Sequence, residues 1–178
     1  KNKFVSAYKL YDLSILFIEK SIDLLRENGF MVFINTNKFL ASDYGIKIRQ
    51  LLMENVSIKK LIDVSYIRVF KEAAAFPIII SYVKQKNNEN KLTIYPKIDD
   101  IKVFEIGLGN GSIIYQEDYR ITPNLIFNVS NNLELSVKIS KSDGIKKLGD
   151  LEHKFIYRPL GFTNWNTKLK NLRNTPAK

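Results

Sequence analysis

The feature that most constrains the fold is the order of hydrophobic patterns over residues 1–97. Apolar side chains spaced by three and four positions predict amphipathic helices over residues 8–26 and 44–54. Short apolar runs predict strands over residues 30–34, 57–64, 77–84 and 91–95. The run at 30–34 is continuous, which is typical of a strand buried on both faces. This order predicts an α/β sheet whose early strands are parallel and whose later strands are antiparallel.

The predicted sheet begins with a helix, whereas a doubly wound sheet normally begins with the strands that carry its ligand-binding turns. The chain also starts with Lys1 rather than Met. We therefore expect it to be part of a longer polypeptide, with residues 1–97 forming the back half of a sheet domain. Residues 98–147 show weaker patterning and are predicted to be a connecting segment. Residues 148–178 restart at Leu148-Gly149-Asp150 and are predicted to begin a second domain.

Composition narrows the chemistry that this chain can perform. The 178 residues contain no Cys and one His, His153, which excludes disulfides, thiolate metal sites, Cys nucleophiles and multi-histidine metal sites. Lys and Arg total 28 against 18 Asp and Glu, and the formal net charge of +10 favours a polyanionic partner, with nucleic acid first. No apolar run reaches the roughly 18 residues of a membrane helix. We expect a cytoplasmic protein without a metal site.

The C-terminal tail, residues 154–178, concentrates positive charge. It holds six basic residues and no acidic ones, interleaved with aromatic rings. Because cations neutralise phosphates and rings stack on bases, this composition is typical of a nucleic-acid surface. Arg158, Trp165 and Lys168 are the candidate DNA contacts in the tail. The first strand of a small domain, followed by a disordered basic end, fits the same composition equally well.

A glycine-rich segment, residues 103–111, is a candidate cofactor site. Glu105 precedes glycines at positions 107, 109 and 111, a pattern similar to the first motif of methyltransferases that bind S-adenosylmethionine. In that motif the glycines let the backbone approach the cofactor where a strand turns into a helix. Residues 112–119 instead predict a strand and a turn. A glycine-rich surface hairpin is therefore favoured over a cofactor site.

Five short blocks in the first 70 residues occur in a characteristic order and spacing. They contain Tyr11-Asp12-Leu13, Asn28-Gly29-Phe30, Asn37-Lys38-Phe39-Leu40 followed by Tyr44-Gly45 and Arg49, Ile62-Asp63-Val64, and Val69-Phe70. Together they resemble the back half of the catalytic domain of adenine-specific DNA methyltransferases of the Taq type. These enzymes occur alone or fused to a nuclease in type II restriction–modification systems. The restart at Leu148 resembles the entry to the target-recognition domain of the same family.

The resemblance implies a fold, a reaction and partners. The implied fold is a Rossmann-like methyltransferase sheet whose back half has late antiparallel strands. The implied reaction is transfer of a methyl group from S-adenosylmethionine to the exocyclic amine of adenine in double-stranded DNA, after the base has been flipped out of the duplex. A fused or associated restriction nuclease is a further implied partner, and no membrane is involved.

In this family an aromatic residue ahead of a late strand stacks on the flipped adenine. Phe70 matches that residue, because it follows Val69 and precedes the strand at 77–84, and Phe76 is the alternative ring. An aromatic face replaces roughly 1–3 kcal/mol of the stacking that a flipped base loses. Lys71, beside Phe70, is a candidate phosphate contact. The alternative interpretation is that Phe70 packs beneath its loop as part of the core.

The family's Asn-Pro-Pro-Tyr/Phe loop, which binds the flipped adenine, does not occur in this sequence. In the family that loop and the cofactor motif both lie upstream of the helix predicted at 8–26. The resemblance therefore implies that this chain holds neither catalytic nor cofactor-binding residues and is inactive alone. Two other functions stay open. One is a non-catalytic DNA-binding or specificity module that uses the basic tail, and the other is a self-contained small methyltransferase built on Glu105 and its glycines.

Two further residues have two interpretations each. Arg49 either holds the second helix against the sheet or reaches a phosphate, and the structural role is favoured. Asp63, at the end of a predicted strand, either lines a cleft or caps a neighbouring loop.

Overall fold

The computed structural model describes residues 3–70 and 76–130, together with residues 132, 135, 137–139 and 142. The chain divides into two units, Lys1–Lys141 and Ser142–Lys178. Nearly all described residues belong to the first unit, which contains the sheet.

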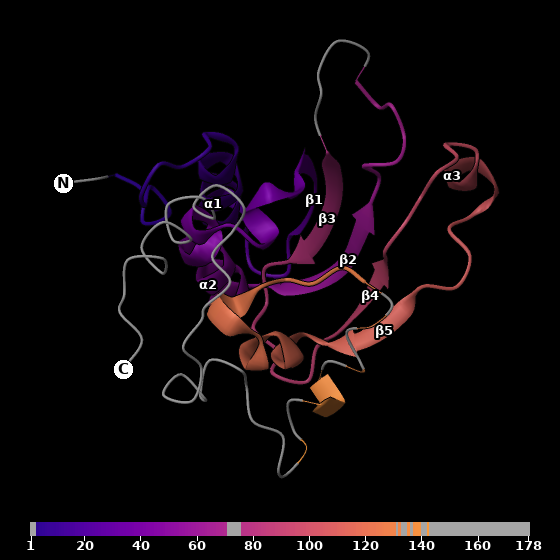
Figure 1. Cartoon of the computed structure of the whole chain (residues 1–178). Helices are drawn as coiled ribbons and strands as arrows, with labels where there is room; N and C mark the ends of the chain where they lie inside the picture. Colours follow the sequence, from indigo (N-terminus) through magenta and orange to yellow (C-terminus); the bar gives the residue numbers. More distant parts are fainter. Residues whose placement is uncertain are drawn as a thin grey trace, which may run out of the picture. The chain divides into compact units, whose positions relative to one another are not determined.

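A five-stranded sheet forms the centre of the first unit. Its strands are β1 (Phe30–Thr36), β2 (Ser57–Asp63), β3 (Pro77–Val83), β4 (Lys91–Tyr95) and β5 (Ser112–Tyr115). The α-helices of the described part are α1 (Ser14–Leu24), α2 (Ile46–Asn55) and the one-turn α3 (Val103–Ile106). Short 3-10 helices are η1 (Asn37–Leu40), η2 (Asp43–Gly45), η3 (Gln116–Ile121) and η4 (Pro123–Leu125). Figure 1 shows α1 and α2 together on one face of the sheet, and α3 on a loop away from them.

The sheet is mixed, with the strand order β1-β3-β2-β4-β5. Strand β3 is antiparallel to both β1 and β2, so β1 and β2 run in the same direction without touching. Strand β4 is parallel to β2, and β5 is antiparallel to β4. A mixed α/β architecture is thus present. The prediction that the later strands are antiparallel is confirmed for β3 and β5 and is wrong for β4, which is parallel to β2.

The main core lies between the two long helices and one face of the sheet. Ile15 and Ile18 of α1 and Ile48 of α2 are fully buried there, and each such side chain contributes roughly 1.5–3 kcal/mol through burial. Strands β2 to β5 contribute the sheet side of this core: Ile58, Leu61, Ile78, Ile80, Tyr82, Leu92, Ile94 and Ile114. The amphipathic pattern of the sequence therefore predicts which helix faces are buried.

Helix α1 begins at Ser14, six residues later than predicted. Lys9, inside the predicted helix, has a φ of 56°, which does not occur in an α-helix. Further upstream, the carboxylate of Glu19 accepts hydrogen bonds from the backbone amides of Val5 and Ser6, both at 2.8 Å. Asp12 then accepts a hydrogen bond from the amide of Ser14 at 2.9 Å and opens the helix. These bonds hold residues 5 and 6 beside the helix rather than in it.

Strand β1 differs from its predicted environment. Its side chains alternate, and Met31 and Phe33 pack against the core below α1. Phe30, Val32 and Ile34 face the other side of the sheet and are 58%, 55% and 41% exposed. The continuous apolar run therefore does not describe a strand buried on both faces in this structure, because one face of β1 is uncovered.

Residues 112–127, within the segment predicted to be connecting, lie in the same unit as the sheet. The side chain of Gln116 accepts a hydrogen bond from the amide of Ile58 at 2.8 Å and donates one to the carbonyl of Val56 at 2.9 Å. The ring of Tyr119 stacks on that of Phe127 with centroids 4.6 Å apart. The bonds of Gln116 attach this segment to the rest of the first unit, whereas the stack of Tyr119 on Phe127 lies within the segment itself.

Candidate functional site

The carboxyl ends of β1 and β2 form one edge of the sheet, and a cleft of about 310 Å³ opens there. Ligands of open α/β sheets bind at this edge, where strand ends and their loops leave a crevice. The lining comes from η1 and the residue after it, the carboxyl end of β2, the amino end of β3 and residues 126–129. These residues are Asn37, Lys38, Leu40, Ala41, Asp63, Ile78, Ile126, Phe127, Asn128 and Val129. Four segments far apart in the sequence therefore meet in this cleft.

Backbone hydrogen bonds fix the walls of the cleft. The amide of Asn37 donates to the carbonyl of Phe76 at 2.8 Å, and the amide of Phe127 donates to the carbonyl of Leu40 at 2.9 Å. The carbonyl of Asp63 accepts from the amide of Ile98 at 2.9 Å. These long-range bonds hold the η1 wall against β3 and against residues 126–129.

The cleft combines an apolar lining with a few polar side chains, which is the usual composition of a small-molecule or base-binding site. The side chains of Asn37, Lys38 and Asn128 form no hydrogen bond or ion pair within residues 3–70 and 76–130. Oδ1 of Asp63 accepts hydrogen bonds from the amide and the hydroxyl of Ser65. Asp63 thus has both of the roles that the sequence allowed, since it lines the cleft and caps the following turn.

The two candidate stacking rings are both accessible. Phe70 is 45% exposed and Phe76 is 58% exposed, and neither belongs to a hydrophobic core cluster. The bond between Asn37 and the carbonyl of Phe76 places the Phe76 backbone at the cleft wall. A ring packed beneath its loop would be buried, so the exposure of Phe70 does not fit that interpretation.

Four of the predicted DNA contacts lie outside the described residues. They are Lys71, Arg158, Trp165 and Lys168. Their roles stay predictions.

Arg49 has a structural role. Its side chain is fully buried, and its guanidinium donates to the carbonyls of Phe39, of Ser42 at 2.9 Å and of Asn124 at 3.0 Å. Burial lowers the pKa of Arg49 below its ordinary value, with the nearby carboxylate of Asp43 acting in the opposite direction. A guanidinium engaged with three carbonyls supports the wall of the cleft and is not available to a phosphate.

The glycine-rich segment does not fit S-adenosylmethionine. Glu105 lies in the one-turn helix α3, Gly107 ends that helix, and the glycines lead into β5. The order is helix, glycine loop, strand, the reverse of the strand-to-helix turn that brings backbone amides to a cofactor. Cβ atoms built at Gly107 and Gly109 would meet nothing within 4 Å, so these glycines lie in open space.

The described residues contain no group of three or more His, Asp or Glu side chains suited to a metal ion.

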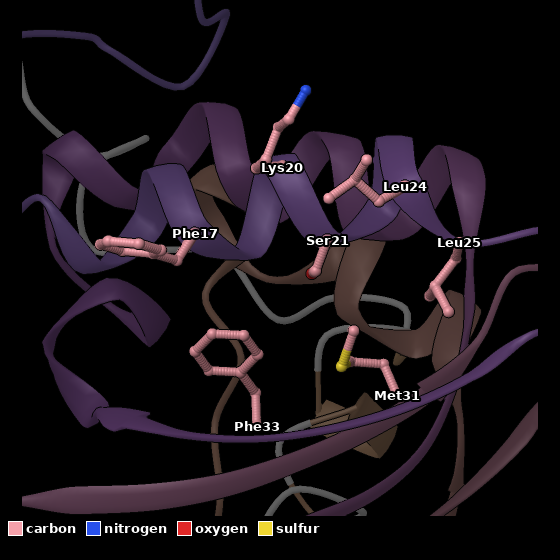
Figure 2. Close-up of a pocket in the computed structure, with 7 residues that line it drawn as sticks. All are labelled: Phe17, Lys20, Ser21, Leu24, Leu25, Met31 and Phe33. Atoms are coloured by element: carbon pink, nitrogen blue, oxygen red, sulfur yellow. The ribbon is translucent and has the colours of Figure 1, made fainter.

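A second cavity, of about 250 Å³, lies between α1 and β1. Figure 2 shows Met31 and Phe33 of β1 directed toward α1, and the Lys20 side chain directed away from them. The hydroxyl of Ser21 is already bonded to the carbonyl of Ile18 at 2.7 Å and to the hydroxyl of Tyr82 at 2.5 Å. This groove is therefore apolar and contains no free polar group for chemistry.

Sequence reasoning missed three polar residues of the cleft. Asn37 and Lys38 belong to one of the matching sequence blocks but were given no role, and Asn128 was not singled out.

Among the described residues, no helix is both long and apolar enough to cross a membrane.

Comparison with known proteins finds matches for the N-terminal part of the chain. Residues 1–70 match the family model described as "Eco57I restriction-modification methylase". The chain is 37% identical over 90 residues to the Type II restriction enzyme and methyltransferase RM.Eco57I of Escherichia coli, in an alignment that covers 51% of this chain and 9% of that protein. These matches indicate homology to restriction–modification methyltransferases.

Two further relatives are methyltransferases named without a nuclease. The chain is 27% identical over 106 residues to the Type II methyltransferase M.BstVI of Geobacillus stearothermophilus, covering 58% of this chain and 19% of that protein. It is 31% identical over 90 residues to the Type II methyltransferase M.HincII of Haemophilus influenzae, covering 48% of this chain and 18% of that protein. The chain thus spans less than a fifth of the length of each of these relatives.

A solved structure described as "Structural basis underlying complex assembly and conformational transition of the type I R-M system" aligns with 94% of this chain and 39% of its own. The sequence identity is 8% and the TM-score is 0.48, so the likeness supports no conclusion about function.

Proposed function

We propose that this chain is part of an adenine-specific DNA methyltransferase of a type II restriction–modification system. The longer protein would transfer a methyl group from S-adenosylmethionine to the exocyclic amine of adenine in double-stranded DNA. The observation that carries the proposal is the cleft at the ends of β1 and β2, because the segment homologous to restriction–modification methylases supplies Asn37, Lys38 and Asp63 to it.

The proposed contribution of this chain is one wall of the pocket for the flipped base. A base that leaves the duplex loses its stacking neighbours, and an accessible ring restores roughly 1–3 kcal/mol of that interaction. Phe70 is the proposed ring and Phe76 the alternative, since both are accessible and both precede β3 in the chain. The exposed rings can contact a base without unfolding any part of the described core.

The donor site is proposed to lie in a part of the protein outside these 178 residues. Two observations support this: the glycine-rich segment does not fit the donor, and the chain spans only 9% to 19% of the relatives named above. We accordingly propose that the chain alone transfers no methyl group. A nuclease in the same polypeptide, as the name of RM.Eco57I states for that protein, is a further proposal, as is action on DNA in the cytoplasm.

A second candidate function is a non-catalytic DNA-specificity module. It is favoured by one observation, the six basic and no acidic residues of the tail at 154–178. Methyl transfer separates the two candidates, because a specificity module binds DNA but leaves its bases unmodified.

The test is product identification with the full polypeptide that contains this chain. Purified protein is incubated with duplex DNA and S-adenosylmethionine, and the DNA is digested to nucleosides for mass spectrometry. The proposed function requires N6-methyladenine. Methylated cytosine would overturn the adenine specificity, and unmodified DNA that is nevertheless bound would favour the specificity module.

A further inference from the structure

Lys38 stands on a turn that the fold holds rigidly at the mouth of the cleft. Its neighbours Phe39 and Leu40 are 0% and 6% exposed, while Lys38 itself is exposed. The carbonyl of Lys38 accepts hydrogen bonds from the amides of Ala41 at 3.3 Å and Ser42 at 3.0 Å. The guanidinium of Arg49 also binds the carbonyl of Phe39. The backbone that carries this cation is therefore fixed before any ligand binds, which lowers the entropy cost of binding.

Asn128 reaches the same cleft from the other segment and is held in a similar way. Its carbonyl accepts a hydrogen bond from the hydroxyl of Tyr119 at 3.1 Å, and Tyr119 is fully buried. Its side-chain amide has no hydrogen bond within the described residues. Lys38 and Asn128 together line a cleft of only about 310 Å³, and both present unused N–H donors.

Lys38 is the one cationic side chain among the described residues that line the cleft, so an anionic ligand would pair with it. The ammonium of Lys38 forms no ion pair in the described part of the chain. The carboxylate of Asp63 is the one acidic group that lines the cleft, and its Oδ1 is occupied by the amide and hydroxyl of Ser65. A ligand that fits must offer an anionic oxygen to Lys38 and an uncharged part to the apolar lining. A nucleotide within a DNA strand has both.

We propose that Lys38 and Asn128 bind one phosphodiester of the DNA strand at the mouth of this cleft. This inference rests on the proposed function, since it assigns a phosphate contact next to the base pocket. Lys38 supplies the charge that displaces a condensed counterion, and Asn128 supplies a neutral N–H donor. The contact fixes the position of the strand and carries no sequence information of its own.

The test is the salt dependence of DNA binding by the full polypeptide, measured by fluorescence anisotropy with a mixed-sequence duplex. Affinity is measured between about 50 and 200 mM salt for the wild type and for Lys38→Gln, Lys38→Arg and Asn128→Ala. Lys86→Gln is the matched control. Lys86 is an exposed lysine that follows the other end of β3, away from the cleft. Melting temperatures of all variants confirm that each one folds.

For Lys38→Gln, the slope of log affinity against log salt should fall by about 1, because one phosphate contact no longer releases a counterion. Lys38→Arg should keep the wild-type slope. Asn128→Ala should weaken binding by about threefold to tenfold with an unchanged slope, because it removes a neutral donor. Lys86→Gln should match the wild type. Equal slopes for Lys38→Gln and Lys86→Gln overturn the inference.

Methylation of DNA by the same wild-type preparation separates this inference from the proposed function. If the wild type methylates adenine and Lys38→Gln keeps its slope, the phosphate contact is wrong and the function stands. If the wild type binds DNA without methylating it and the slope falls, the function is wrong and the contact stands. A wild type that binds no duplex DNA overturns both.

Discussion

The guanidinium of Arg49, on α2, donates a hydrogen bond at 3.0 Å to the backbone carbonyl of Asn124, 75 residues further along the chain. The same group donates to the carbonyls of Phe39 and Ser42 beside η1. One buried cation therefore joins the η1 wall of the cleft to the segment that precedes residues 126–129. The geometry of the cleft depends on this side chain, although Arg49 itself does not line it.

Arg49→Met should lower the free energy of unfolding by about 1–3 kcal/mol, the usual cost of leaving hydrogen-bond acceptors of the interior without a donor. The reason is that the carbonyls of Phe39, Ser42 and Asn124 lose their donor. Urea unfolding monitored by circular dichroism measures the difference. Lys47→Met on the same helix is the control, with an expected change within about 0.5 kcal/mol. Similar losses for both variants would contradict the structural role of Arg49.

Gly45→Ala should destabilise the protein by about 1–3 kcal/mol, the range for overpacking a tight site. A Cβ at position 45 would lie 2.5 Å from Nη1 of Arg49 and would also collide with the carbonyl oxygen of Phe39. Because both substitutions disrupt one bond network, Gly45→Ala and Arg49→Met should be strongly non-additive in a double-mutant cycle. Additive losses in urea unfolding would show that the glycine and the arginine act separately.

Tyr119→Phe should change how stability depends on pH. Burial raises the pKa of Tyr119 above its ordinary value of 10.0. Above pH ~10 the unfolded chain releases this phenolic proton while the folded chain retains it, so the free energy of unfolding falls as pH rises. The buried Tyr82 acts in the same direction. Burial raises its pKa, and the hydrogen bond with Ser21 lowers the pKa by a smaller amount.

In the Tyr119→Phe variant, the fall in stability above pH ~10 should be shallower than in the wild type. At neutral pH the variant should lose about 0.5–1.5 kcal/mol, because the carbonyl of Asn128 loses its donor. Urea titrations at several pH values measure both effects. Parallel profiles for the wild type and Tyr119→Phe would contradict the prediction.

Phe70→Ala in the full polypeptide should lower kcat/KM for DNA methylation by about 5- to 150-fold, the equivalent of 1–3 kcal/mol of lost stacking. Phe70→Trp should retain most of the activity. Since Phe70 is 45% exposed, its removal should change the free energy of unfolding by less than about 1 kcal/mol. Steady-state kinetics and urea unfolding on the same preparations give both numbers.

Phe76→Ala is the paired variant for this measurement. A loss of activity in Phe76→Ala but not in Phe70→Ala would assign the stacking role to Phe76. Full activity in both variants, or a large loss of stability in Phe70→Ala, would rule out Phe70 as an exposed stacking ring.

The sequence predicts the strands well because each is a short apolar run between polar turns. The predicted strand at 91–95 has the bounds of β4, and β2 and β3 each end one residue earlier than predicted. The start of α1 was predicted too early, since helical periodicity does not reveal that Lys9 adopts a left-handed conformation. Strand order could not be predicted, because the position of β3 depends on pairing rather than on local pattern.

The candidate site is only partly visible in the sequence. Asp63 is recognisable because a carboxylate at the end of an apolar strand stands out. Lys38 and Asn128 do not stand out, since each is a polar residue in an irregular segment. The bond between the amide of Phe127 and the carbonyl of Leu40, together with the side chain of Arg49, brings their segments to one cleft. Such a pairing between distant loops leaves no periodic signal.

The most direct measurement of the central claim compares methyl transfer by two proteins, the 178-residue chain alone and the full polypeptide that contains it. Each is incubated with duplex DNA and tritiated S-adenosylmethionine, and label in the DNA is counted. We expect transfer by the full polypeptide and background counts for the chain alone, because the proposed role of this chain is to supply a wall for the base, with the donor site elsewhere in the full polypeptide. Label transferred by the 178-residue chain itself, or by neither protein, would contradict that claim.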